Sequence, residues 1–257
     1  MSELSKSGTR SAKAFASLSI DADSGAAGAK VVIAELLDRL QQLRIAASWA
    51  LTDFAVAPMM QRNAECAMGH EVALLSDAAL AKADLSRTDI MQCVVRPLQL
   101  AADGGINIST LAVGYAWQPR HIDLLTKYGL TMIRTPHVFS SRTTTGVRAI
   151  CYGLWHVPVS ASMKGGGWMA NLSQWRIARR AVDRAIQDGG WCHLRIDLAS
   201  LATGDAICGM RTIDRLLRHL VQLRSTGHIA LETLRDTAAR LTPRRSVAAA
   251  HSILHAA

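Results

Sequence analysis

The sequence predicts a parallel α/β fold, and two observations lead to this prediction. Short apolar runs of β-type composition alternate with segments of helical periodicity from residue 15 to residue 241. Hydrophobic residues make up 49% of the chain and charged residues 19%, which is typical of a globular protein with a buried core. The 257 residues are enough for a single α/β domain. We therefore predict one domain at 15–241, a disordered N-terminal tail at 1–14 and a C-terminal tail at 242–257.

The expected elements follow one another in regular alternation. Seven apolar runs are predicted strands: 15–20, 46–51, 71–75, 108–113, 131–134, 153–159 and 191–196. Apolar residues three and four positions apart predict helices at 31–43, 58–66, 90–102, 119–128, 174–187, 210–224 and 231–241. A doubly wound sheet and a barrel both satisfy this order. No G-x-G-x-x-G motif follows the first strand, so the main sign of a nucleotide-binding sheet is missing.

The chain is basic, with a formal net charge of +9. Much of the excess is arginine in two predicted helices, between 176 and 184 and between 211 and 224, where Asp183 and Asp214 are interleaved. Such spacing is typical of a solvated helix face. No nucleic-acid-binding motif accompanies the arginines, so we expect no nucleic-acid partner. An anionic glycan or another acidic partner matches the charge better.

Neither a membrane span nor an export signal is evident. No apolar run approaches the roughly 18 residues that cross a bilayer. The N-terminus is polar and lacks the apolar stretch of a secretory signal, so we expect a cytoplasmic protein. The five cysteines are widely spaced and form no C-x-x-C pair, which favours free, buried thiols over disulfides or a zinc site.

Five segments carry recognisable motifs. They are 18–23 (LSIDAD), 45–51 (IAASWAL), 69–71 (GHE), 124–130 (LLTKYGL) and 193–197 (HLRID). In order and spacing, these segments resemble the polysaccharide deacetylases, the NodB-homology family, over about residues 15–241. The resemblance implies that family's fold, a distorted TIM-like (β/α)7 barrel, and a role in carbohydrate metabolism.

The resemblance also implies a metal-dependent site, which this chain does not match. In the family, one aspartate acts as base, a second joins two histidines on a divalent metal, and a last-strand histidine is the general acid. Asp21 matches the base position. Asp23 matches the aspartate ligand in the family's S-D-x-D variant, whereas the adjacent-pair form of the motif puts Ala22 there, and both aspartates could instead only accept backbone hydrogen bonds in the turn after the first strand. Leu75 and Ala79 replace the two histidines, and Asp197 stands where the last-strand histidine is expected. The third-motif arginine is not recognisable at 113–119. The resemblance therefore predicts a degenerate metal site.

Four aspartates are expected to lie near one barrel mouth: Asp21, Asp23, Asp77 and Asp197. Without cations these carboxylates would repel one another and raise one another's pKa. A hard divalent cation such as Mg²⁺ or Ca²⁺ could relieve that repulsion through oxygen ligands. A rebuilt carboxylate metal site is thus one hypothesis, and a mouth with no cofactor is the other.

Further residues are candidates for ligand binding at the same mouth. Trp117 and Trp168 fall near predicted strand-to-helix loops and could stack on sugar rings, although aromatic residues in such places often only pack. His156 lies near a predicted strand end and is either a binding residue or framework. His70 begins its strand, roughly 16 Å from position 75, so we expect a structural role.

Three functions are consistent with these observations. The first is a glycan-binding or pathway-supporting protein with a degenerate metal site. The second is a diverged, active hydrolase of carbon–nitrogen bonds in an N-acetylated sugar, with Asp21 as base. The third is a scaffold that binds a partner protein through its basic helices. The sequence leaves the substrate and the oligomeric state open.

Overall fold

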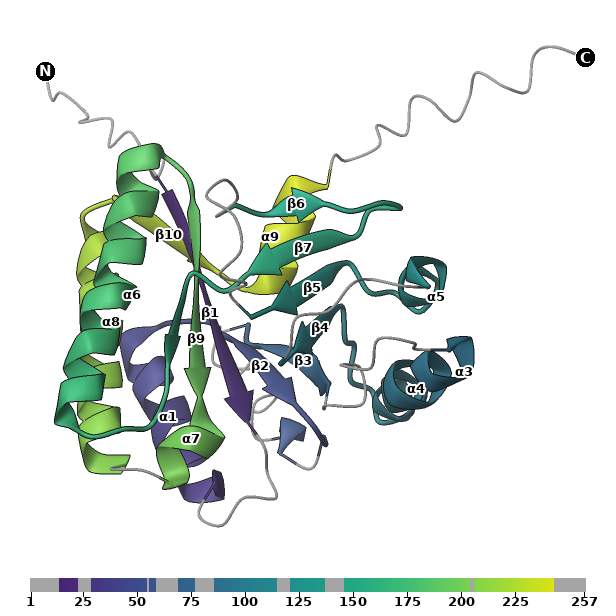
Figure 1. Ribbon diagram of the computed structural model, residues 1–257, viewed down its shortest axis with the longest axis horizontal. Helices are drawn as coiled ribbons and strands as arrows, with labels where there is room; N and C mark the ends of the chain where they lie inside the picture. The colour runs from purple at the N-terminus through teal and green to yellow at the C-terminus, as the bar shows by residue number, and fades with distance from the viewer. Residues whose placement is uncertain are drawn as a thin grey trace, which may run out of the picture.

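The structure is a computed structural model that describes residues 14–22, 29–54, 56–58, 69–76, 86–114, 121–136, 146–203 and 206–242. These residues form one ten-stranded sheet with helices around it (Figure 1). The strands are β1 (Ala14–Ala22), β2 (Ser48–Leu51), β3 (Glu71–Ser76), β4 (Thr110–Val113), β5 (Met132–Thr135), β6 (Arg148–Ala149), β7 (Trp155–Pro158), β8 (Ala161–Met163), β9 (Trp191–Asp197) and β10 (Ile229–Glu232). The helices are α1 (Ala29–Leu43), α3 (Arg87–Ile90), the π-helix η2 (Met91–Val95), α4 (Arg96–Asp103), α5 (Ile122–Lys127), α6 (Trp168–Asp188), α7 (Leu198–Thr203), α8 (Ala206–Ser225) and α9 (Leu234–Leu241).

The sheet is parallel and strongly curled. Its strand order is β6-β7-β5-β4-β3-β2-β1-β9-β8, β10 pairs with β1, and only the β6–β7 pairing is antiparallel. Three strands separate β5 from β1 in this order, yet Arg134 on β5 hydrogen-bonds to Asp21 on β1. The side chain can make that contact only if it crosses the concave face of a curled sheet. The predicted distorted α/β barrel is confirmed.

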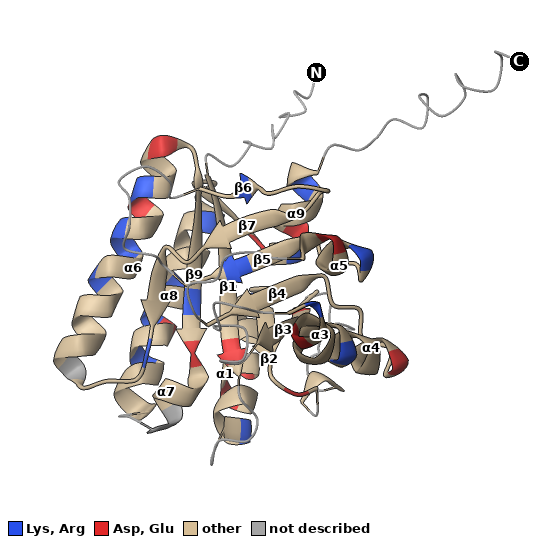
Figure 2. Cartoon of the chain, turned by 45° about the vertical axis from the view of Figure 1, so that its right-hand side comes forward, with Lys and Arg blue, Asp and Glu red and all other residues tan. Residues whose placement is uncertain are grey.

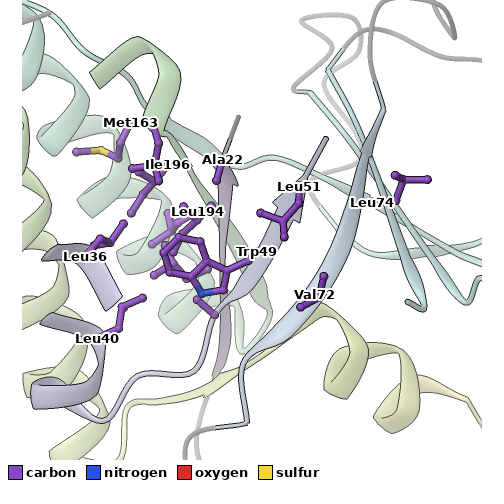
Figure 3. Close-up of a cluster of buried hydrophobic side chains, with 14 of the residues drawn as sticks. Ala22, Leu36, Leu40, Trp49, Leu51, Val72, Leu74, Met163, Leu194 and Ile196 are labelled. Atoms are coloured by element: carbon purple, nitrogen blue, oxygen red, sulfur yellow. The ribbon is translucent and has the colours of Figure 1, made fainter. Parts of the chain in front are cut away.

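The convex face of the sheet is apolar and is covered by helices. Trp49 on β2 is fully buried and lies against Leu36 and Leu40 of α1 and Leu194 of β9 (Figure 3). The α1 residues recur at spacings of three and four, so they form one stripe that faces the sheet. This face thus holds the main hydrophobic core, as the alternation of strands and amphipathic helices predicts.

The predicted helix at 231–241 is wrong at its start. Residues 229–232 form β10, which pairs with the first half of β1, whereas β2 pairs with the second half. Helix α9 begins only after Thr233, whose side chain accepts a hydrogen bond from the Asp236 backbone while the Asp236 carboxylate accepts one from the Thr233 backbone. This capping box separates strand from helix. The short strands β6 and β8 were also not predicted.

The G-H-E segment fastens α9 to the N-terminal end of the barrel. Glu71 is buried and accepts hydrogen bonds from the hydroxyls of Ser48 (2.6 Å) and Thr110 and from the backbone N–H of Arg235 (2.9 Å). Burial raises the pKa of Glu71, and the hydrogen bonds from Ser48 and Thr110 oppose that rise. His70 accepts a hydrogen bond from the Ala47 backbone (3.1 Å), which is a structural role. Both motif residues therefore lie at the end of the barrel opposite the mouth.

The described helices include none that is both long and apolar enough to cross a membrane. Except for Ala14 and Thr242, the predicted tails at 1–14 and 242–257 lie outside the described residues, as does most of the predicted helix at 58–66.

Candidate functional site

An ion-paired cluster occupies the concave face of the barrel near the C-terminal end of β1. Asp21 is 4% exposed, and its carboxylate accepts hydrogen bonds from two arginines. Arg134 pairs with both oxygens: Nη1 donates to Oδ1, and Nη2 donates to Oδ2 at 2.9 Å. Arg195 Nε donates to Oδ2 at 2.6 Å. Asp21 is therefore held by three charge-assisted hydrogen bonds, two of them in a bidentate pair.

Small residues on the intervening strands give Arg134 the room to cross the barrel. Ala50 on β2, Ala73 on β3 and Ala112 on β4 form a buried cluster, and Ala112 is paired in register with Arg134. The arginine itself is fully buried. A buried charge is costly unless it is paired, so the position of Arg134 depends on Asp21 as much as that of Asp21 depends on Arg134.

The polar cluster continues from Arg134 into the barrel. Arg134 Nη1 also donates to Ser19 Oγ (3.0 Å), and Ser19 Oγ lies 2.8 Å from His193 Nε2. His193 is fully buried, and burial together with the nearby positive charges of Arg134 and Arg195 lowers its pKa well below the usual value. The imidazole is therefore neutral around pH 7. Among the described residues, His193 Nδ1 and Arg134 Nε have no hydrogen-bond partner.

The outer part of the cluster is partly open to solvent. Arg195 is 15% exposed and Asp197 is 20% exposed, and Arg195 Nη2 lies 3.4 Å from Asp197 Oδ2. Asp197 ends β9, beside Asp21 in register, and its Oδ1 accepts a hydrogen bond from the Ser200 backbone (3.1 Å) in α7. The mouth thus presents a guanidinium group and a carboxylate side by side, both held in place.

The predicted repulsion among carboxylates is wrong for Asp21 and Asp197. Arg195 lies between them and binds both, and Arg134 adds a second positive charge at Asp21. The other two residues of that prediction, Asp23 and Asp77, lie outside the described residues. Within the part of the chain that the structure describes, no three His, Cys, Asp or Glu side chains are grouped to hold a metal ion.

The metal that the resemblance implies does not fit the residues present. Leu75, in place of the first histidine, packs against the alanine cluster on the concave face and offers no donor atom. Ala79, in place of the second histidine, lies outside the described residues, and alanine has no side-chain ligand. The carboxylate of Asp21 already accepts three hydrogen bonds from two guanidinium groups. This donor set suits a cation poorly.

Of the remaining predicted binding residues, His156 is not brought to this cluster. His156 on β7 pairs in register with Ile133, so it lies on the opposite face of the sheet from Arg134 and does not line the mouth. Its ring nitrogen Nε2 is 2.8 Å from Thr135 Oγ1, and burial followed by the charge of Arg148 lowers its pKa. Trp117 lies outside the described residues, and Trp168 is the first residue of α6.

Sequence reasoning missed both arginines of the cluster. The third-motif arginine was sought at 113–119, whereas the arginine that binds Asp21 stands one strand later, at Arg134, with Pro136 two residues after it. A signal was available. Arg134 and Arg195 lie within the short strands MIRT and WCHLRID, and a charged residue inside a buried strand needs a partner.

No protein-family model matches the chain, and no curated protein matches it in sequence. Solved structures match its fold. A Mycobacterium smegmatis protein assigned as a polysaccharide deacetylase superposes with a TM-score of 0.64 at 12% identity, over 91% of this chain and 94% of that one. The allantoinase PuuE gives 0.64 at 9% identity, over 89% and 90%. A mutant of BA3943, described as a CE4 family pseudoenzyme with restored enzymatic activity, gives 0.52 at 10% identity, over 89% and 68%. The chain therefore has the fold of the polysaccharide deacetylases.

Proposed function

We propose that the chain is a polysaccharide-deacetylase-like protein with a degenerate metal site. It binds a glycan or an N-acetylated sugar at the barrel mouth and supports a carbohydrate pathway without metal-dependent hydrolysis. The proposal rests on the contacts of the Asp21 carboxylate. Both of its oxygens are occupied by guanidinium groups, and Leu75 stands where the resemblance expects a ligand histidine.

The same contacts argue against Asp21 as a general base. A base must be free to take a proton from water, and it works best when its proton affinity is matched to the operating pH. Three hydrogen bonds from the two guanidinium groups occupy both oxygens of the Asp21 carboxylate.

The partly exposed groups of the mouth suit a sugar. Arg195 supplies donors, and Asp197 supplies acceptors to hydroxyl and amide groups. Because Arg195 is fixed by Asp21 and Asp197 by the Ser200 backbone, neither group loses much conformational freedom on binding. The neighbouring Leu75 is apolar and half-buried, and it offers a surface for the face of a sugar ring.

The proposal is tested by binding and turnover in one experiment. Isothermal titration with N-acetylglucosamine tetramer should give a dissociation constant, and a parallel assay should detect no acetate. The variant Arg195→Gln should weaken binding by about 10-fold or more, as expected when a hydrogen bond to a charged group is lost. Arg218→Gln removes the same charge from an exposed position on α8 and should leave binding unchanged. Absence of tetramer binding in the unaltered protein would reject this function.

A second candidate function is the hydrolysis of a carbon–nitrogen bond without a metal. It is favoured by the position of Asp21 near the C-terminal end of β1, since catalytic groups of such barrels gather at that end of the strands. In this case the unaltered protein would release acetate, and Asp21→Asn would abolish that release. If the unaltered protein releases no acetate, glycan binding remains as the proposed function.

A further inference from the structure

A band of arginines covers the outer wall of the barrel, formed by α6 and α8. The two helices pack side by side (Figure 1), and they carry eight arginines against three aspartates and no lysine. The excess of five positive charges is more than half of the formal net charge of +9. Figure 2 shows the basic residues spaced along both helices. The band is defined by Arg176, Arg179, Arg180 and Arg184 of α6 and Arg211, Arg215 and Arg218 of α8.

These seven arginines are exposed, and their spacing keeps them together. Arg176, Arg180 and Arg184 follow one another at four-residue steps, which places them about 6 Å apart along one side of α6. On α8, Arg211, Arg215 and Arg218 make the equivalent row.

Contacts between the helices bring the two rows together. The guanidinium of Arg215 lies over the ring of Trp175 on α6, 4.8 Å from its centroid, and His219 of α8 packs edge-on against the same ring. The rows therefore form one surface.

Few acidic groups neutralise this surface. Asp183 pairs with Arg179 at 3.6 Å, and Asp214 pairs with Arg218 at 2.9 Å. Among the described residues, Arg176, Arg180, Arg184 and Arg211 have no carboxylate partner. An uncompensated array of this kind attracts polyanions, and the planar guanidinium group matches carboxylate and sulfate oxygens in pairs.

We propose that this arginine band binds a linear acidic polysaccharide that bears carboxylate or sulfate groups. Two parallel helices side by side make a broad basic surface along which an extended chain can lie. The features that nucleic-acid readers use are not evident in it. Among the side chains that the structure describes, the band exposes no aromatic ring for base stacking, since Trp175 is buried. Neither helix stands alone to enter a groove. The band is remote from the mouth, so the inference is independent of the tetramer-binding site.

The test compares two triple variants of equal charge. R176Q/R180Q/R211Q removes three arginines from the band. R87Q/R96Q/R148Q removes three exposed arginines from α3, α4 and β6, away from α6 and α8 (Figure 1). Binding of alginate, a polyuronate, is measured at 20 mM and 200 mM salt. The band variant should bind alginate at least 10-fold more weakly than the unaltered protein at low salt, and the other variant less than threefold more weakly.

The possible outcomes are distinct. Equal losses in the two variants would mean that only net charge matters, and would overturn the proposal. Tighter binding of double-stranded DNA than of alginate at equal anionic charge would also overturn it, in favour of a nucleic-acid surface. N-acetylglucosamine tetramer binding should persist in the band variant and weaken in Arg195→Gln, so failure of either proposal is recognised separately.

Discussion

Replacement of Arg134 by methionine should destabilise the protein by about 3 kcal/mol, because it leaves the Asp21 carboxylate in a buried site with a single partner. Two charges about 4 Å apart interact by about 4 kcal/mol at the effective dielectric typical of proteins, and breaking a buried pair costs about 3–5 kcal/mol. Arg195, which binds the same carboxylate at 2.6 Å, keeps the loss at the lower end of that range. Methionine fills a similar volume, so a cavity contributes little.

The measurement is urea unfolding followed by tryptophan fluorescence, with the buried Trp49 and Trp175 as reporters. A double-mutant cycle separates the pair from its surroundings. Asp21→Asn with Arg134→Met removes both charges, and it should be less destabilising than the sum of the single changes by about 2 kcal/mol. The control Arg218→Met, at a position with a 67% exposed side chain, should change stability by less than about 0.5 kcal/mol. A loss below 1 kcal/mol in Arg134→Met, or a coupling near zero, would refute the buried pair.

Three further outcomes follow from the same structure. Glu71→Gln should lower the free energy of unfolding by about 1–3 kcal/mol, measured by thermal unfolding, because the amide NH₂ group of glutamine would face one of three buried hydrogen-bond donors. The exposed Glu35→Gln is the matched control. Equal melting temperatures for Glu71→Gln and the unaltered protein would exclude a role of Glu71 in holding α9 in place. Stability should decline as the pH falls below 6.5, since His193 has a lowered pKa in the folded state and the unfolded chain takes up the proton first. His193→Gln should flatten that decline, and an unchanged slope in urea titrations at pH 7.5 and 5.5 would contradict it. The rest of the decline is expected from His70, His156 and His219, whose pKa values are also lowered in the folded state. Calorimetric titration with Zn²⁺, Mg²⁺, Mn²⁺ or Ca²⁺ should show only background heat. Saturable binding of any of these ions would contradict the conclusion that the residues at the mouth do not fit a metal ion.

The sequence was a good guide to the elements that repeat with a clear period. Strands β1, β2 and β3 were predicted because each falls in a short apolar run. Helices α1 and α8 were predicted because apolar residues recur three and four positions apart over their length. Strand β10 was missed because it has only four residues and adjoins a helix of similar composition. A window long enough to detect helical periodicity takes in both elements and merges them.

The candidate site was predicted only in part, for a different physical reason. The motif in β1 identifies Asp21 from residues next to it in sequence. Its partners stand 113 and 174 residues further along the chain, and only the curl of the sheet brings Arg134 within reach. No local pattern encodes that pairing. The general rule that a buried arginine needs a partner predicts that a partner exists, but not which carboxylate it is.

The arginines at the mouth stabilise the barrel, and in the function proposed above they stand in place of a metal ion. A carboxylate buried near the C-terminal end of β1 needs a positive neighbour, and either a metal ion or a guanidinium group can supply the charge. The two differ in what else they do. A metal ion coordinates water and lowers its pKa, whereas a guanidinium group stays protonated and has no open coordination position. Arg134 and Arg195 neutralise Asp21, so in the function proposed above no metal ion is needed to hold that carboxylate. The partly exposed Arg195 and Asp197 then remain as fixed polar groups, which suit recognition of a ligand better than its hydrolysis.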